Sequence, residues 1–155
     1  MMEMPKPGPE QRKLEQLAGI WKCEEKMYPS QWDPKGGMAT GHVRSHLAAG
    51  GFVVTGDYEQ ERDGKKTFQG HSVFSYDAQE KCYLLHWWDS MGMPAEVFRG
   101  NFEGANLVLI SKNPMGHFRM THEFPAPGKH RSKMEISQDG VTWNPMFESL
   151  ATRVD

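Results

Sequence analysis

The chain has 155 residues, a length that suits one domain able to bury about two-thirds of its unfolded surface. Its 18 basic and 20 acidic residues leave a formal charge of −2, with no block of like charge. Nucleic acids and anionic membranes are bound through basic patches, so this composition argues against both as partners.

The cysteine content bears on metal binding and on the cellular compartment. Cys23 and Cys82 are the only cysteines, and neither lies in a CxxC or Cys/His spacing that would indicate zinc. A single disulfide between them stays open as an alternative. The sequence shows no signal-peptide core and no apolar run long enough to span a bilayer. We therefore expect a cytoplasmic protein with free thiols and without membrane insertion.

The N-terminal segment predicts an arm followed by a helix. Residues 1–9, MMEMPKPGP, carry three prolines and predict an irregular arm. The next eight residues place Leu14 and Leu17 on one side of a short helix that begins after Pro9 and ends near Gly19.

The remaining chain alternates short extended runs with turn signals. The runs are 20–28, 38–47, 52–61, 66–76, 82–93, 95–102, 107–112, 117–124, 130–138 and 143–154. This pattern predicts an all-β fold, a closed up-and-down antiparallel barrel of about ten strands, because closure removes exposed strand edges. A two-sheet sandwich is the main alternative. Residues 10–155 would form this single domain, with the helix plugging or flanking one mouth.

The run 82–93, CYLLHWWDSMGM, is the densest aromatic stretch of the chain. Both of its alternating faces begin with apolar residues, so we expect this strand to be covered on both sides. Trp87 and Trp88 must point in opposite directions. We place Trp88 inside the barrel together with His86, an assignment that one β-bulge would reverse.

Five segments and one arginine resemble a known family. They are LAGIW at 17–21, GGF at 50–52, GHSVFSYD at 70–77, LHWWDSMG at 85–92, SQDGVTW at 137–143, and Arg153. The chain resembles, from about residue 10 to its end, the lipocalin-like (calycin) family catalogued as domain of unknown function 1579. The resemblance implies a closed barrel of about ten strands, with Trp21 closing its floor. Calycins generally hold small apolar or amphipathic molecules, which implies a binding role by analogy.

Three of the 7 histidines lie on predicted apolar faces. His122 alternates with phenylalanine and methionine, His86 shares a face with Trp88, and His71 alternates with valine. If these faces line the barrel, the imidazoles would anchor a polar group of a ligand, a metal or a haem. The alternative is that each is a hydrogen-bonded core histidine, and no HxH or HExxH spacing supports a metal.

Two carboxylates lie on predicted apolar faces. Glu25 shares a face with tryptophan, cysteine and methionine, and Glu148 shares one with methionine and leucine. An inward carboxylate would have a raised pKa and would be able to act as an acid or base. We favour a structural ion pair with Arg119 or Arg153, because buried charge is seldom left alone. No GxSxG motif or glycine-rich phosphate loop is present.

The leading hypothesis is that the barrel binds a small, mostly apolar or amphipathic molecule, since apolar walls with a few polar groups are typical of ligand pockets. The ligand-binding candidates are His71, His86, Trp88, Phe118, Met120, His122, Met134 and Glu148. The alternative is an enzyme that uses the same cavity with a histidine general base or a histidine-bound metal or haem. A third hypothesis is a filled barrel whose outer surface pairs with a second copy or with another protein. The apolar residues on the outer faces are compatible with a homodimer. The sequence indicates no particular cofactor, catalytic residue or metal site.

Overall fold

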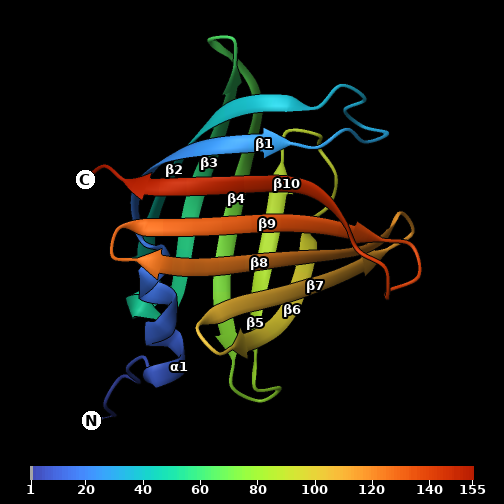
Figure 1. Ribbon diagram of the computed structural model, residues 1–155. Helices are drawn as coiled ribbons and strands as arrows, with labels where there is room; N and C mark the ends of the chain where they lie inside the picture. Colours follow the sequence, from blue (N-terminus) through green and yellow to red (C-terminus); the bar gives the residue numbers. More distant parts are fainter. Residues whose placement is uncertain (1) are drawn as a thin grey trace.

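Ten strands close into one antiparallel barrel in a computed structural model that describes residues 2–155 (Figure 1). The strands are β1 (Gly19–Met27), β2 (Gly37–Ala48), β3 (Val53–Arg62), β4 (Lys65–Asp77), β5 (Cys82–Asp89), β6 (Glu96–Glu103), β7 (Asn106–Asn113), β8 (Gly116–Ala126), β9 (Lys129–Ser137) and β10 (Asn144–Arg153). Each pairs with its neighbours in sequence, and β1 closes the barrel against β10. The predicted closed barrel is therefore confirmed, and the two-sheet sandwich is excluded.

The β3–β4 hairpin shows how local sequence sets this topology. Asp63 and Gly64 both have positive φ, at 52° and 75°. Two consecutive residues of positive φ form the tight turn whose twist matches that of paired strands. Arg62 and Lys65 are paired directly across it. The hairpin thus fixes the register that brings the end of β3 to the rim of the barrel.

A short helical segment closes the opposite end of the barrel. It comprises α1 (Pro9–Arg12) and the 3₁₀ turn η1 (Lys13–Leu17), at the lower left of Figure 1. The predicted inward side is confirmed, since Leu14 and Leu17 are buried at 1% and 6% exposure. They pack into a core of Val54, Phe74, Tyr83, Leu85, Phe98, Leu107 and Leu109. The helix therefore plugs this end rather than flanking it.

Trp21 lies beside the plug, as the calycin resemblance implies. Its indole Nε1 donates to the Leu17 carbonyl at 3.1 Å. The Arg153 guanidinium lies over the ring, 4.9 Å from its centre, and also donates to the Ala18 carbonyl. First and last strands are thereby joined at the helix-covered end, which leaves the other end of the barrel as the route to its interior.

The two faces of β5 are the reverse of the prediction. Leu85 is 2% exposed and Trp87 borders the interior, whereas Trp88 is 42% exposed. Placing Trp88 and His86 inside was therefore wrong. The reason lies in the facing strand, where Gly70 has no side chain and the Trp87 ring fills the space: a Cβ on Gly70 would lie 2.1 Å from Trp87 Cη2. The β4–β5 pairing runs without a bulge.

Candidate functional site

The barrel encloses a cavity of about 480 Å³. Aromatic rings and methionines form a large part of its wall, among them Phe68, Phe74, Trp87, Phe98, Phe118, Met120, Met134, Met146 and Phe147. Four of the predicted ligand-binding residues border it, namely Phe118, Met120, His122 and Met134. They come from the adjacent strands β8 and β9, in which side chains of alternate residues share one face.

The cavity extends toward the end of the barrel opposite the helix. Tyr28, Ser30, Trp32 and Asp33, all in the loop that joins β1 to β2, belong to its lining. This loop lies at the upper right of Figure 1, far from the helix. The loops at this open end carry exposed apolar side chains: Trp32, Met91, Met93, Met115 and Val141. Access to the cavity therefore passes an apolar rim.

A buried carboxyl group lies in the β1 wall of the cavity. Glu25 is 1% exposed, and its Oε1 accepts hydrogen bonds from Tyr58 Oη at 2.7 Å and Gln60 Nε2 at 3.3 Å. Burial raises the pKa of Glu25, while these two donors oppose the shift. Gly41 makes room for the group, because a Cβ there would lie 2.7 Å from it. The predicted inward position of Glu25 is confirmed.

The predicted ion-pair partners of the carboxylates are wrong. Arg119 pairs with Glu135 at 3.1 Å, and Arg153 pairs with Asp155 at 3.6 Å. Both arginines are on or near the outer surface, so neither reaches Glu25. Neutral donors satisfy the buried carboxyl group instead, which avoids burying a second charge.

The two thiols are separate and free. Cys23 lies in the cavity wall one inward position before Glu25, and burial raises its pKa to about 12. Because the thiolate is the reactive form, this thiol is a poor nucleophile at neutral pH. The disulfide that the sequence left open is not formed.

A hydrogen-bonded pair of imidazoles forms a polar part of the wall on β8 and β9, where His130 packs against Trp21. His122 Nδ1 and His130 Nε2 share a hydrogen bond of 2.9 Å, and the two rings are stacked. Burial lowers the pKa of both, that of His130 to about 4. The buried His122 Nε2 has no hydrogen-bond partner within residues 2–155. The Phe74 ring packs against His122 edge to face.

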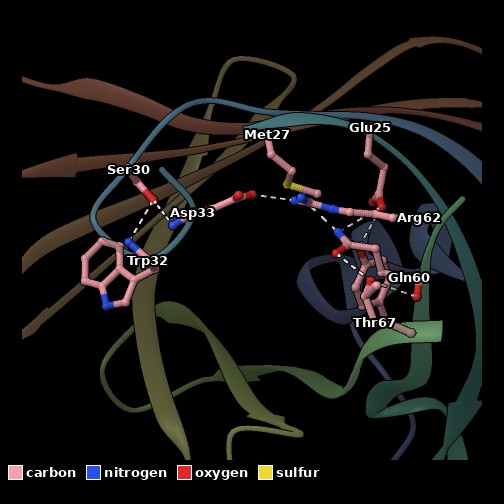
Figure 2. Close-up of polar contacts among 9 residues, drawn as sticks. Glu25, Met27, Ser30, Trp32, Asp33, Gln60, Arg62 and Thr67 are labelled. Atoms are coloured by element: carbon pink, nitrogen blue, oxygen red, sulfur yellow. Dashed lines mark hydrogen bonds and ion pairs between the residues drawn. The ribbon is translucent and has the colours of Figure 1, made fainter. Parts of the chain in front are cut away.

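An ion pair links the open-end loop to β3, as Figure 2 shows. Arg62 Nη2 donates to Asp33 Oδ2 at 2.6 Å. Ser30 Oγ accepts from the backbone amides of Trp32 and Asp33 at 3.2 and 3.1 Å, which orders the tip of this loop. Arg62 Nε is buried and has no hydrogen-bond partner among residues 2–155. The guanidinium thus has one strong partner, while its buried Nε–H is unpaired among these residues.

The remaining predicted residues lie outside the barrel. His71 Nδ1 contacts Asp57 Oδ1 at 2.8 Å and its Nε2 contacts Thr55 Oγ1 at 2.9 Å, both on the outer face of β3. His71, His86 and Trp88 therefore do not face the interior, contrary to the prediction. Trp88 instead borders a groove on the outer surface together with His71.

Glu148 also points outward, because β10 has a bulge between Pro145 and Phe147. The extra residue breaks the alternation that placed Glu148 with Met146. Met146 and Phe147 both border the cavity, and Glu148 faces the outer surface opposite Lys26 and Lys133.

Several residues of the cavity and of the ion pair at its open end were not predicted from the sequence. Tyr58, Gln60 and Arg62 alternate along β3, a period-2 signal that would have placed them with Glu25 once one of them was known to face inward. Asp33 lies in a loop without periodicity. His130 begins a predicted strand but has no apolar neighbours in sequence that mark its face.

Two further observations concern metals and membranes. Within residues 2–155, no group of three or more His, Cys, Asp or Glu side chains is arranged to hold a metal ion. None of the helical segments in that part of the chain has the length and apolarity needed to cross a lipid bilayer.

Comparisons with known proteins agree on the fold. The crystal structure of Rv2717c from M. tuberculosis matches with a TM-score of 0.72 at 14% identity, covering 96% of this chain and 99% of that one. The S-type phycobiliprotein lyase CPES from Guillardia theta matches with a TM-score of 0.60 at 11% identity, with the same coverage of both chains, 96% and 99%. A search of curated proteins found no match. The model of the family described as "Protein of unknown function (DUF1579)" matches residues 6–153, so this chain belongs to that family.

Proposed function

We propose that this protein binds a small, mostly apolar molecule inside the barrel. The observation that carries the proposal is the cavity of about 480 Å³, walled by aromatic rings and methionines and reaching the open end. Ligand pockets have this size and makeup, with apolar walls and a few placed polar groups. Methionine side chains adapt to irregular shapes, so the wall suits more than one ligand outline.

Two hydrogen-bonded groups in the wall support the proposal because their members already pair with each other; His122 Nε2 is the exception, with no partner within residues 2–155. Glu25 accepts from Tyr58 and Gln60, and His122 is bonded to His130. An apolar molecule beside these groups would not break the hydrogen bonds that they already make. Its binding therefore has a small desolvation penalty. Burial of its own apolar surface then supplies the driving force.

Fluorescence titration with N-phenylnaphthylamine, an uncharged dye that brightens in apolar surroundings, tests the proposal. Ser132 borders the cavity, so Ser132→Phe should fill space that the dye would occupy. The neighbouring Lys133 faces outward with 40% side-chain exposure, which makes Lys133→Phe the matched control. We expect one site per chain, lost or weakened at least about tenfold in Ser132→Phe and retained in Lys133→Phe.

Absence of dye binding by the wild-type protein, or equal binding by Ser132→Phe, would overturn the proposal. Circular dichroism and thermal unfolding establish that each variant is folded, and Ser132→Leu provides a smaller filling side chain if the phenylalanine is not tolerated. Native mass spectrometry of the purified protein then gives the mass of any molecule that occupies the cavity.

A further inference from the structure

We propose that the molecule bound in the barrel is an amphipathic anion, with its acidic head held by Arg62 in the place that the Asp33 carboxylate occupies in this structure. This inference rests on the proposed function and adds the chemical class of the ligand.

The guanidinium of Arg62 has the geometry of an anion-binding site, and the Asp33 carboxylate occupies only part of it. Arginine presents Nε and Nη2 along one edge of its guanidinium, and a carboxylate bound at that edge accepts from both. Asp33 Oδ2 accepts from Nη2 at 2.6 Å, while the buried Nε has no partner within residues 2–155. A ligand carboxylate that took the place of Asp33 and accepted from both Nη2 and Nε would satisfy both donors, and would remove the penalty of a buried donor without an acceptor.

The position of Arg62 suits the head of an amphipathic molecule. Figure 2 shows the guanidinium between Asp33 of the loop and the side chains of Gln60 and Met27. Asp33, Gln60 and Met27 all border the cavity, at its open end. A ligand head at Arg62 would therefore have apolar wall on its inner side and the loop on its outer side.

The exchange of one carboxylate for another balances in charge. Asp33 lies in a loop and its side chain is 33% exposed, so it can return to water when displaced. Glu25, the other carboxyl group near Arg62, already accepts from Tyr58 and Gln60. Because the ion pair is replaced rather than lost, the apolar burial of the ligand body and the second hydrogen bond at Nε favour the exchange.

Three probes with one chain and different heads test this inference: dodecanoate, dodecanol and dodecyltrimethylammonium. Each is titrated calorimetrically below its micelle-forming concentration, and by displacement of N-phenylnaphthylamine. We expect dodecanoate to bind at least about tenfold more tightly than dodecanol, the usual size of a charge-assisted hydrogen bond, and the cationic probe to bind most weakly.

Variants of Arg62 and Asp33 test whether this ion pair causes the preference for the anionic head group. Arg62→Gln should abolish the advantage of dodecanoate over dodecanol, and Asp33→Asn should tighten dodecanoate binding several-fold by removing the competing carboxylate. Arg99 is exposed on the outer face of β6, and Asp63 is exposed in the β3–β4 turn, so Arg99→Gln and Asp63→Asn are the matched controls and should leave both affinities unchanged.

The outcomes separate this inference from the proposed function. Equal binding of dodecanoate and dodecanol, tightest binding of the cationic probe, or an anion preference that survives Arg62→Gln would each overturn the inference and leave the cavity as a binding site. Failure of all three probes and of the dye would overturn both. If Arg62→Gln does not fold, the head-group series in the wild type and in Asp33→Asn decides alone.

Discussion

His122 and His130 face each other across adjacent strands, with 2.9 Å between Nδ1 of the first and Nε2 of the second. One ring nitrogen must donate and the other accept, so the bond requires both imidazoles to be uncharged or to share a proton. The His130 ring also stacks on Phe124, 5.0 Å between centres. An extra proton would place a charge among these apolar rings, and this is why burial lowers the pKa of each histidine.

This pair predicts that the protein loses stability in mild acid. The pKa of His130 is lowered from 6.5 to about 4, so above pH 6.5 neither the folded nor the unfolded state is protonated there. As the pH falls from 6.5 toward 4, the unfolded state takes up the proton first. The unfolding free energy should then fall by about 1.4 kcal/mol per pH unit, about 3 kcal/mol for His130 alone. Urea unfolding at a series of pH values measures the slope.

His130→Gln should flatten that slope, because glutamine does not titrate yet still offers a hydrogen-bond partner to His122. His46, exposed on β2, gives the control variant His46→Gln, in which the slope should stay that of the wild type. A wild-type slope that persists in His130→Gln would show that other groups cause the acid sensitivity.

Glu25 predicts the opposite dependence on pH. Burial raises its pKa above the usual 4.5, so the folded state keeps the proton to higher pH than the unfolded state does. Its contribution is therefore largest below pH 4.5 and is lost as the pH rises through the folded-state pKa. Glu25→Gln should be more stable than the wild type at pH 8, by on the order of 1 kcal/mol, and the difference should shrink at pH 5.

The exposed neighbour Glu24 on β1 supplies the control for this titration. Glu24→Gln should change the unfolding free energy by less than about 0.5 kcal/mol at either pH. Chemical unfolding at pH 5 and pH 8 gives the comparison, and a Glu25→Gln variant that is less stable than the wild type at pH 8 would contradict the raised pKa of Glu25.

The barrel was predictable from sequence because consecutive strands are joined by short turns, so each strand pairs with the next. The β8 and β9 part of the cavity was predictable for a related reason: Phe118, Met120 and His122 alternate without interruption. Such local signals need no knowledge of distant contacts.

The misplaced residues depend on contacts that the local pattern does not contain. The inward position of Trp87 depends on the missing side chain of Gly70 in the neighbouring strand. The outward position of Glu148 depends on a bulge that shifts the alternation of β10. The ion pair joins residues 29 apart in sequence, Asp33 in an aperiodic loop and Arg62 at a strand end. Both apolar faces of β5 looked alike in sequence, so only the facing strand decides between them.

The fit between Gly70 and Trp87 can be tested by a double-mutant cycle. In Gly70→Ala the new Cβ would meet the six-membered part of the indole, with Cη2 at 2.1 Å and Cζ2 at 2.4 Å. We expect a loss of about 1–3 kcal/mol in unfolding free energy. Trp87→Phe lacks these ring atoms, so Gly70→Ala in that background should be nearly neutral. Equal losses in both backgrounds, measured by urea unfolding, would place the strain elsewhere.

The packing of the helical plug predicts which side-chain truncation lowers the unfolding free energy most. Leu14 is 1% exposed and packs into the core at the closed end, and the Tyr83 hydroxyl donates to the Glu10 carbonyl at 2.7 Å to hold the segment in place. Leu14→Ala should lower the unfolding free energy by about 2–5 kcal/mol through lost burial and the cavity left behind. The adjacent, exposed Glu15 gives the control Glu15→Ala, for which the change in unfolding free energy should be below about 0.5 kcal/mol.

If the plug serves only to close the barrel, Leu14→Ala should still bind N-phenylnaphthylamine at the opposite end with one site per chain. A loss of under 1 kcal/mol for Leu14→Ala would mean that the barrel is stable without its plug.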